Sequence, residues 1–202
     1  MSTFNVSDQN KYLDHKIVSG LERLAQVFRI LLWEKAKVHG LSPIQIQLLI
    51  FLKYHPESLS TISYLAKEFN MTKPTVSDAV KVLEEKKLIK KFTSGVDTRS
   101  YTMQLTAVGN KMVAETEDFA DPIRKLIAQS KSIDPSALWE GIYSIIMELN
   151  RQGVISVQRT CTSCRHYTTK NKLPYCALLE QKLLPHDIRI DCPEFEEVEV
   201  SG

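Results

Sequence analysis

The spacing of three residues between positions 60 and 87 is the feature that most restricts the fold of this chain. Ala66 is followed four residues later by Asn70, and Val76 comes six residues after that. Two helices that cross closely need a small residue at the contact, a turn residue that tolerates positive φ, and an apolar anchor on the second helix. The segment therefore predicts a helix-turn-helix whose second helix begins near residue 73 and ends near residue 87.

The second helix of this motif has an apolar and a polar face. Its apolar residues follow the i, i+3, i+4, i+7 spacing of a helix that packs on a core: Val76, Ala79, Val80 and Leu83. The polar face carries the candidate DNA-binding residues Lys73, Thr75, Ser77, Asp78 and Lys81. Lysines and hydroxyls bind phosphates or base edges, and a carboxylate accepts from cytosine N4, so this face suits a major groove. The solvated face of an ordinary amphipathic helix gives the same pattern.

A basic hairpin follows and favours the DNA-binding interpretation. Two β-like runs, 88–93 and 100–105, are joined by a loop that contains a glycine. From Lys73 to Arg99 the chain has seven Lys or Arg against four Asp or Glu, although its net charge is +2. Arg99 can enter the negative potential of a minor groove, and Asp97 is placed to orient its guanidinium. The loop therefore predicts a wing that contacts the groove next to the helix.

Helices are predicted before this motif. The first 40 residues carry an apolar stripe at three- and four-residue spacing, formed by Leu13, Ile17, Leu21, Leu24, Phe28, Leu31 and Leu32. Gly40 is a plausible stop for that helix. A second helix starts at residues 42–43, a Ser-Pro pair, and stops at residues 55–56, a His-Pro pair. Ser60 can then cap a short third helix.

Two more helices are expected after the hairpin. Thr106 can cap a helix that is disturbed at residues 121–122, an Asp-Pro pair, and ends near residue 133. A second Asp-Pro pair at residues 134–135 starts the next helix, and Gly153 closes it. The predicted fold is mainly α with a small β-hairpin wing. Residues 1–157 form a winged helix-turn-helix and helical dimerisation domain, with a DNA-binding core at about 42–106, and residues 158–202 form a cysteine-rich module.

The wing and the residues after it resemble the signature of the MarR family of bacterial regulators. That signature is Asp-x-Arg in the wing, then a strand, then Leu-Thr-x-x-Gly. This sequence matches it at Asp97-Thr98-Arg99, Leu105-Thr106 and Gly109. The resemblance covers about residues 8 to 155. It implies that Asp97, Thr98 and Arg99 act in the wing, with Arg99 the groove or phosphate contact.

The same resemblance implies an assembly and partners. Members of this family form symmetric dimers through the first helix and the last two, and bind double-stranded DNA at two half-sites of a pseudo-palindrome. Repression is their commoner mode, and many bind small aromatic or phenolic effectors. We therefore expect a homodimeric transcriptional regulator that represses its target genes. A winged-helix adaptor that binds proteins instead of DNA is an alternative, and the basic wing argues against it.

Four cysteines in the last 42 residues predict a metal site. Their pattern is Cys-x2-Cys-x11-Cys-x15-Cys, at Cys161, Cys164, Cys176 and Cys192. The first pair has the spacing of a knuckle in which one tight turn supplies two thiolates, and tetrahedral zinc suits four thiolates in a short segment with few apolar residues. The sequence therefore predicts a structural zinc site in the cysteine-rich module.

Two alternatives to zinc stay open at this point. Four thiolates also suit an iron–sulfur cluster, and Cys192 is followed by a proline as in cluster-binding sequences. The first cysteine pair also suits a thiol–disulfide switch, which would make the protein a redox-sensing regulator. His166 or His186 could replace one cysteine, although a single histidine near cysteines is more often a bystander, and we leave both outside the predicted ligand set.

Several classes of protein are disfavoured. The sequence has no nucleophile elbow, phosphate-binding loop or zinc-protease motif, so an enzyme is not expected. No run approaches the roughly 18 apolar residues that span a bilayer. The first residues lack the layout of a secretory signal, and the clustered cysteines suggest a metal more than disulfides, so we expect a cytoplasmic protein without a membrane partner.

Overall fold

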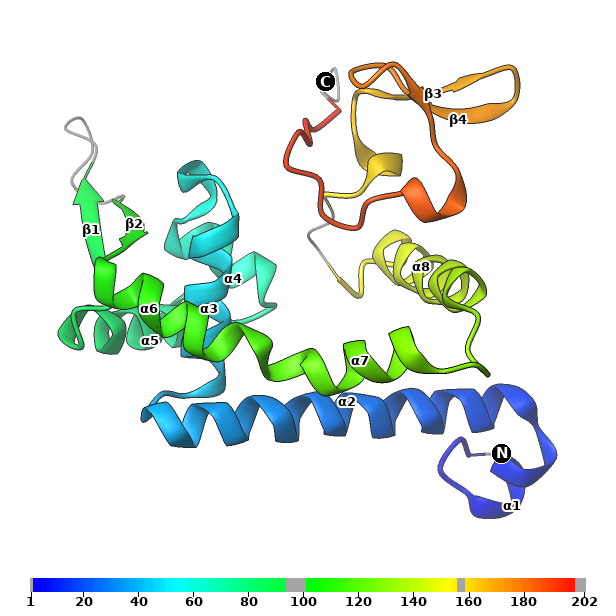
Figure 1. The fold of residues 1–202 in the computed structure, drawn as a ribbon, viewed down its shortest axis with the longest axis horizontal. Helices are drawn as coiled ribbons and strands as arrows, with labels where there is room; N and C mark the ends of the chain where they lie inside the picture. Colours follow the sequence, from blue (N-terminus) through cyan, green and yellow to red (C-terminus); the bar gives the residue numbers. More distant parts are fainter. Residues whose placement is uncertain (1, 94–100, 156–158, 199–202) are drawn as a thin grey trace. The chain divides into compact units, whose positions relative to one another are not determined.

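The computed structural model describes residues 2–93, 101–155 and 159–198 (Figure 1). The chain divides into two compact units. The first comprises Met1–Tyr54, Ala79–Lys90 and Leu105–Arg124, and the second comprises His55–Asp78, Lys91–Gln104 and Lys125–Gly202. Within the described residues, no helix is both long enough and apolar enough to cross a membrane.

The first unit is helical, and a long helix is its main element. This helix, α2 (Leu13–His39), contacts the short α1 (Val6–Lys11), α3 (Pro43–Tyr54) and the 3-10 turn η2 (Glu117–Ala120). Helix α6 (Ala107–Thr116) packs on α3. The predicted stop of α2 is confirmed, because Gly40 adopts a left-handed φ of 62° and its N–H donates to the last turn.

The N-terminal apolar stripe lies entirely on α2, which is separated from α1 by the extended backbone of Tyr12. Only the C-terminal end of the stripe is buried within the chain, at Leu32. The stripe's other residues include large side chains with substantial exposure, namely Leu13, Ile17, Leu21, Leu24 and Phe28. The apolar face of α2 is therefore unpaired over most of its length in the single chain.

A glycine allows the close approach of α6 to the backbone of Leu88, just before the first strand of the hairpin. A Cβ atom on Gly109 would lie 2.0 Å from the carbonyl oxygen of Leu88. Thr106 caps α6 as predicted, since its Oγ1 accepts from the Gly109 N–H at 3.0 Å, and the same hydroxyl donates to the carbonyl oxygen of Lys87 at 2.7 Å. In the Leu-Thr-x-x-Gly pattern, the threonine therefore caps α6, and the glycine permits a backbone contact that leaves no room for a side chain.

The break in the helical segment after α6 lies earlier than predicted. Helix α6 ends at Thr116, the turn η2 follows, and α7 (Asp121–Gln129) starts at the Asp-Pro pair and stops before residue 133. The buried Thr116 hydroxyl donates to the carbonyl oxygen of Met112 at 2.8 Å, a side-chain bond that bends helices. Pro122 then lies in the first turn of α7, where its missing N–H costs no hydrogen bond.

The second unit contains the helix-turn-helix start and most of the wing. After the turn η1 (Glu57–Leu59), helix α4 (Ile62–Glu68) is capped by Thr61, whose Oγ1 accepts from the Tyr64 N–H. The predicted cap at Ser60 is therefore wrong by one residue. Buried Ser60 instead accepts the Met103 N–H at 3.2 Å and donates to the Glu57 carbonyl oxygen at 2.6 Å, so it joins the turn to the hairpin.

The recognition-type helix and the hairpin confirm the predicted order of elements. Helix α5 spans Lys73–Glu85, two residues shorter than expected at its end, and Lys87 beyond it has a left-handed φ of 59°. Strands β1 (Ile89–Thr93) and β2 (Tyr101–Leu105) pair in a two-stranded sheet. Helix α8 (Pro135–Arg151) is capped by Asp134 as predicted, and Gly153 follows it with a φ of 74°.

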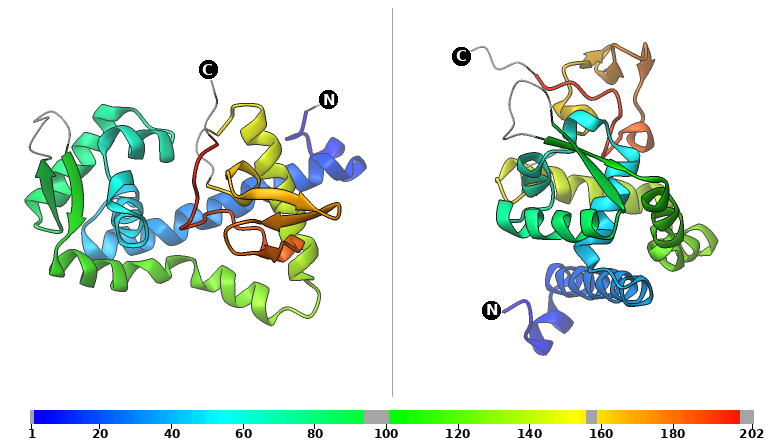
Figure 2. Two further views of the ribbon diagram at one scale, coloured as in Figure 1. Left: turned by 90° about the horizontal axis from the view of Figure 1, so that it is seen from above. Right: turned by 90° about the vertical axis from the view of Figure 1, so that its left-hand side faces the viewer.

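Residues 159–198, here called the cysteine module, contain a small sheet that the sequence patterns did not predict. Strands β3 (Tyr167–Lys170), β4 (Leu173–Cys176) and β5 (Gln181–Lys182) pair in that order and antiparallel. The 3-10 turns η3 (Cys161–Ser163) and η4 (Pro185–Asp187) flank the sheet, and η4 contacts α8 (Figure 2). Its buried apolar core is small and consists of Cys161, Leu183 and Ile188.

Candidate functional site

Helix α5 has one buried apolar face and one exposed polar face, as the sequence predicts. Val76, Ala79, Val80 and Leu83 are buried. The five predicted DNA-binding residues of this helix are all exposed on the surface of the chain: Lys73, Thr75, Ser77, Asp78 and Lys81. The helix therefore presents hydroxyls, two lysines and one carboxylate to the solvent.

The turn before α5 is built as a helix-turn-helix requires. Asn70 has a left-handed φ of 49°, as predicted, and the next amide, Met71 N–H, donates to the carbonyl oxygen of Ala66 at 2.8 Å. The Thr72 hydroxyl accepts from the Thr75 N–H at 3.3 Å, which satisfies a free amide in the first turn of α5. Local hydrogen bonds thus orient the N-terminal end of this helix.

The tip of the wing lies outside the described residues, and with it the predicted contacts Asp97, Thr98 and Arg99. The described strands are anchored by Glu57 in η1, whose carboxylate accepts from the side chains of Thr102 at 2.7 Å and Gln104 at 2.6 Å. Lys91 on β1 lies over the ring of Tyr101 at 4.9 Å from its centroid. The base of the wing is therefore held by side-chain contacts within the second unit.

The fold of the module brings all four predicted ligands to one place. The 3-10 turn η3 forms the knuckle, in which the Cys164 N–H donates to the carbonyl oxygen of Cys161 at 3.0 Å. Cys176 ends β4 opposite Tyr167 on β3, and the Cys192 N–H donates to the carbonyl oxygen of Arg159 at 3.0 Å. Segments that are far apart in the sequence thus converge on one site.

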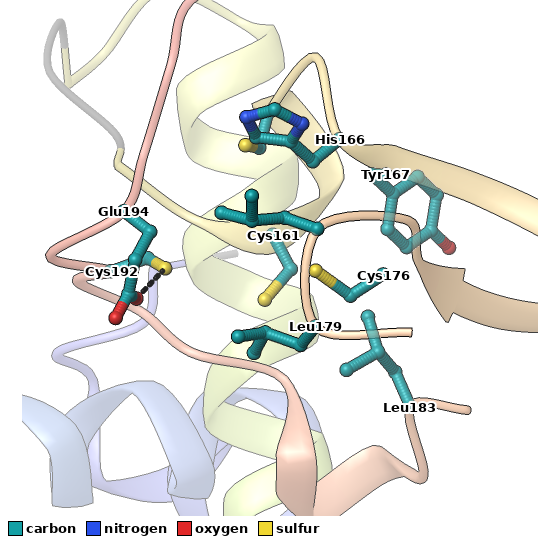
Figure 3. A pocket seen from close by; sticks show the side chains of 10 residues that line it. Cys161, His166, Tyr167, Cys176, Leu179, Leu183, Cys192 and Glu194 are labelled. Carbon is teal, nitrogen blue, oxygen red and sulfur yellow. Dashed lines mark hydrogen bonds between the residues drawn. The ribbon is translucent and has the colours of Figure 1, made fainter. Parts of the chain in front are cut away.

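The four cysteines line one small cavity, of about 20 Å³ (Figure 3). Cys161 and Cys164 are buried, Cys176 and Cys192 are half-buried, and all four are free thiols. Figure 3 shows the sulfur atoms of Cys161 and Cys176 turned toward each other. Among the described residues, no three His, Cys, Asp or Glu side chains are already arranged to hold a metal ion. The ligand types and their convergence fit zinc, and a closed shell requires the sulfurs to move closer together.

Cys192 is the predicted ligand whose thiol hydrogen bond would have to be broken before it could bind a metal. Its thiol donates to Glu194 Oε2 at 3.3 Å, and Arg189 Nη1 lies 3.5 Å from its sulfur. Burial raises the pKa of the Cys192 thiol, against a smaller opposing effect of the Arg189 hydrogen bond. The Arg189 backbone N–H also donates to the Cys161 sulfur at 3.3 Å, a contact of the kind that stabilises thiolate ligands.

His166 lines the same cavity, although the sequence analysis left it outside the ligand set. Its Nε2 is buried, makes no hydrogen bond, and lies 3.2 Å from Glu196 Oε1. His186 is mostly exposed and does not line this cavity. The position of His166 in this cavity could be found only from the fold, because the spacing between Cys164 and His166 does not match a known metal-binding motif.

The structure shows a polar cluster around the buried Arg159, beside the cysteines, that sequence reasoning missed. Arg159 forms a bidentate pair with Asp191, with Nε to Oδ1 at 2.6 Å and Nη2 to Oδ2 at 3.0 Å. It forms a second bidentate pair with Glu68 at the end of α4, at 2.7 and 3.1 Å. Its Nη1 also donates to the Tyr64 hydroxyl at 2.6 Å, and His55 Nε2 lies 2.6 Å from Asp191 Oδ2. We call these five residues the arginine cluster.

The arginine cluster is desolvated and compensated by hydrogen bonds. Only 10% of the Arg159 side chain is exposed. Burial by itself lowers the pKa of Arg159, but the hydrogen bonds to Asp191 and Glu68 outweigh this effect and raise it. For Asp191, burial opposes ionisation, and the bonds from Arg159 and His55 hold its pKa below the usual value. No local pattern could predict the cluster, since Glu68 and Arg159 are 91 residues apart in the sequence.

Comparison with known families agrees with the helix-turn-helix and wing. Residues 39–100 match the family model of the MarR family, over a range that includes Asn70, all of α5 and the first strand of the wing and that ends before β2. The match covers less than half of the chain and includes the helix-turn-helix. The resemblance predicted from the wing is thereby confirmed, and this family is one of transcription regulators and not of enzymes. The family model does not extend over the cysteine module.

Solved structures agree with the fold. A Staphylococcus aureus MepR–DNA complex is 25% identical, covers 68% of this chain and 96% of that chain, and has a TM-score of 0.52. Streptococcus pneumoniae FabT in complex with DNA is 20% identical, covering 68% and 97%, with a TM-score of 0.56. A MarR transcriptional regulator from Methanosarcina mazei is 20% identical, covering 69% and 98%, with a TM-score of 0.55. No curated protein sequence matches the chain.

Proposed function

We propose that this protein is a homodimeric, sequence-specific DNA-binding repressor of transcription that carries a zinc-stabilised module at its C-terminal side. The observation that carries the DNA-binding role is the exposed polar face of α5, formed by Lys73, Thr75, Ser77, Asp78 and Lys81 within the MarR-family match. The similar MepR and FabT structures are DNA complexes, which supports the same partner here. On DNA, lysines and hydroxyls would position α5, and Asp78 would accept from a cytosine amino group.

The homodimer is proposed from the unpaired apolar face of α2. Leu24 and Phe28 are 51% and 42% exposed in the single chain, in a helix that otherwise has a well-formed cap at Gly40. A contiguous exposed apolar stripe marks an interaction surface, and a second copy of the chain offers an identical stripe. Two winged domains would then address two half-sites of a pseudo-palindrome. A small-molecule effector, implied by the family resemblance, belongs to this proposal without an assigned pocket.

Zinc is proposed for the module because its ligand set and its small core fit that metal. Four cysteines line one cavity, and four thiolates in a short segment are the usual ligand set of structural zinc. The module has few buried apolar residues, so metal binding would supply folding free energy that the core does not. Zinc held by four thiolates has no open position, and its role would be structural.

DNA binding is tested by selecting duplexes from a random pool with the purified protein and measuring affinity against salt concentration. We expect a selected pseudo-palindrome. Lys81→Ala and Arg99→Ala should each lower the slope of log affinity against log salt by about one. Lys131→Ala, which removes the same charge from an exposed loop, is the matched control and should leave the slope unchanged. Retention of the wild-type slope by both α5 and wing variants would contradict this interface.

Base readout by Asp78 is tested in the same selection. Asp78→Ala should change the preferred base at one position in each half-site, because its carboxylate is the only acidic group on the predicted contact face of α5. Selection of the wild-type sequence by the variant would contradict direct readout by Asp78. Selection of no sequence by the wild-type protein would favour the adaptor alternative.

The dimer is tested by sedimentation. Leu24→Asp should shift the protein to a monomer at micromolar concentration, since two carboxylates would be buried against each other. Gln26→Asp, on the other side of the same exposed helix, is the matched control and should remain dimeric. Dimerisation of the Leu24 variant with wild-type affinity would contradict an interface on this face of α2.

The metal is tested by metal and acid-labile sulfide analysis, with an absorption spectrum, on protein purified without oxygen. We expect about one zinc per chain and a colourless sample. Iron, sulfide and a brown chromophore would replace the zinc proposal with the iron–sulfur alternative. A metal-free protein with a Cys161–Cys164 disulfide would support the redox-thiol alternative.

A further inference from the structure

The arginine cluster joins the cysteine module to the first helix of the helix-turn-helix. Arg159 and Asp191 belong to the module, whereas Tyr64 and Glu68 belong to α4. The contacts with α4 are one bidentate ion pair, from Arg159 to Glu68, and a hydrogen bond to the Tyr64 hydroxyl, with the guanidinium also 5.9 Å from the Tyr64 ring centroid. One guanidinium that forms bidentate hydrogen bonds with two carboxylates constrains the geometry, because each carboxylate must lie at a fixed orientation to the planar guanidinium.

The same residues lie directly beside two of the predicted metal ligands. Arg159 is two residues before Cys161, and Asp191 immediately precedes Cys192. Arg159 and Asp191 are themselves partners in a parallel β-bridge, and the carbonyl oxygen of Arg159 accepts the Cys192 N–H at 3.0 Å. The two chain segments that would be held together by a metal through their cysteines are therefore the two segments whose side chains bind α4.

We propose that metal binding in the cysteine module controls the helix-turn-helix through the arginine cluster, so that the metal-loaded protein binds DNA more tightly than the metal-free protein. This proposal rests on the proposed function, since it needs both a metal in the module and a DNA-binding role for α5. A metal that ties Cys161 to Cys192 keeps Arg159 and Asp191 in register. The paired side chains of Arg159 and Asp191 then fix the position of α4. Because the short turn at Asn70 connects α4 directly to α5, the start of α5 is fixed as well.

The direction follows from preorganisation. A helix-turn-helix whose first helix is held rigidly loses less conformational freedom on binding DNA. Without metal, the segments of Cys161 and Cys192 are joined by the β-bridge and by hydrogen bonds such as that from the Cys161 N–H to the carbonyl oxygen of Arg189 at 3.2 Å. A separation of Arg159 from Asp191 would leave the buried guanidinium without one of its two carboxylate partners, so the cluster should loosen. Coupling between binding sites in proteins is commonly worth 5- to 150-fold in affinity.

The experiment compares DNA affinity with and without zinc in the full-length protein, using the duplex selected above. For the wild-type protein we expect removal of zinc by a chelator to weaken binding at least fivefold, and re-addition of zinc to restore it. In Glu68→Gln, which alters the α4 side of the cluster without touching a cysteine, the difference should fall below twofold. Glu148→Gln is the matched control, because Glu148 also forms a bidentate pair with an arginine, Arg151, but on the exposed face of α8. This variant should keep the wild-type difference in DNA affinity with and without zinc.

A second measurement covers the case in which the variant is partly unfolded. Hydrogen exchange of the α4 amides should quicken on zinc removal in the wild-type protein and be equally fast with and without zinc in Glu68→Gln. By reciprocity, the wild-type protein should also bind zinc more tightly when DNA is present.

The outcomes separate this inference from the proposals on which it rests. Equal DNA affinity with and without zinc in the wild-type protein would overturn the coupling and leave both DNA binding and the metal site intact. An undiminished zinc effect in Glu68→Gln would show that the coupling does not pass through the arginine cluster and would overturn the proposal. Absence of DNA binding in every form, or of metal in the purified protein, would instead be a failure of the proposed function.

Discussion

The first unit and the cysteine module are stabilised in opposite ways. The first unit buries many large aliphatic side chains, among them Ile46, Leu48, Leu49, Leu83 and Val113. Among its described residues, the module buries only Leu183, Ile188 and two cysteines as apolar residues, and its most buried polar residues are Arg159 and Thr160. Apolar burial is non-directional and additive, whereas ion pairs and thiolate ligands stabilise only in a particular geometry. The first unit should therefore be stable without a ligand, and the module should depend on one.

Metal removal is the strongest test of this contrast. Chelation should abolish the hydrogen-exchange protection of residues 159–198 and leave that of α3 unchanged, because zinc–thiolate binding contributes about 10 kcal/mol or more to the folding of small modules. Trp139 provides a second signal, since its Nε1 donates to the carbonyl oxygen of Pro185 in the module at 3.0 Å. Cys164→Ser should act like the chelator, and Ser163→Ala should not. Equal protection of the module with and without metal would remove the contrast.

Truncation in the first unit should give the next largest effect. Leu49→Ala removes a side chain with no exposure and should destabilise the first unit by about 2–5 kcal/mol in denaturant unfolding. Its zinc content should remain that of the wild-type protein. Val38→Ala, on the same unit but 79% exposed, is the control and should change stability by less than about 0.5 kcal/mol. Loss of zinc on Leu49→Ala would show that the two regions do not fold independently.

A side chain added at Gly109 tests how closely the backbone segments of the first unit are packed against each other. The added methyl would meet the carbonyl oxygen of Leu88, which cannot rotate away, so Gly109→Ala should cost about 1–3 kcal/mol despite its better helix propensity. The neighbouring Val108 is 56% exposed, and Val108→Ala should be nearly neutral. Thermal unfolding followed by circular dichroism measures both. A Gly109→Ala variant as stable as wild type would mean that α6 can move away from Leu88.

The smallest effect is expected at Ser60, in the second unit outside the module. Ser60→Ala leaves the buried Met103 N–H without its acceptor and should cost about 1–2 kcal/mol. Ser58→Ala, which changes an exposed hydroxyl two residues earlier, should have no measurable effect. Denaturant unfolding monitored by exchange of the β2 amides resolves the difference. A neutral Ser60→Ala would show that the hydrogen bond between Ser60 and Met103 does not contribute measurably to stability.

Local signals predicted the helical part of the fold well. The Asp134 and Thr106 caps, the stop at Gly40, the left-handed Asn70 and the buried stripe of α5 depend on a few neighbouring residues each, and all are found in the structure. The predictions that failed are of a different kind. The cap of α4 moved from Ser60 to Thr61 because Ser60 is engaged by Met103, which is 43 residues away in the sequence.

The sequence by itself determined the helix-turn-helix, the wing strands, the polar face of α5 and the identity of the four candidate metal ligands. Each is written in periodicity, capping residues or spacing, which act within one or two turns of chain. The tertiary structure alone decided the small sheet of the module, the common cavity of the cysteines and the contacts of Arg159 with Glu68 and Tyr64. Those features depend on which distant segments of the chain come into contact. Such contacts are decided by burial of apolar groups and pairing of charges over the whole fold, and no local sequence pattern records them.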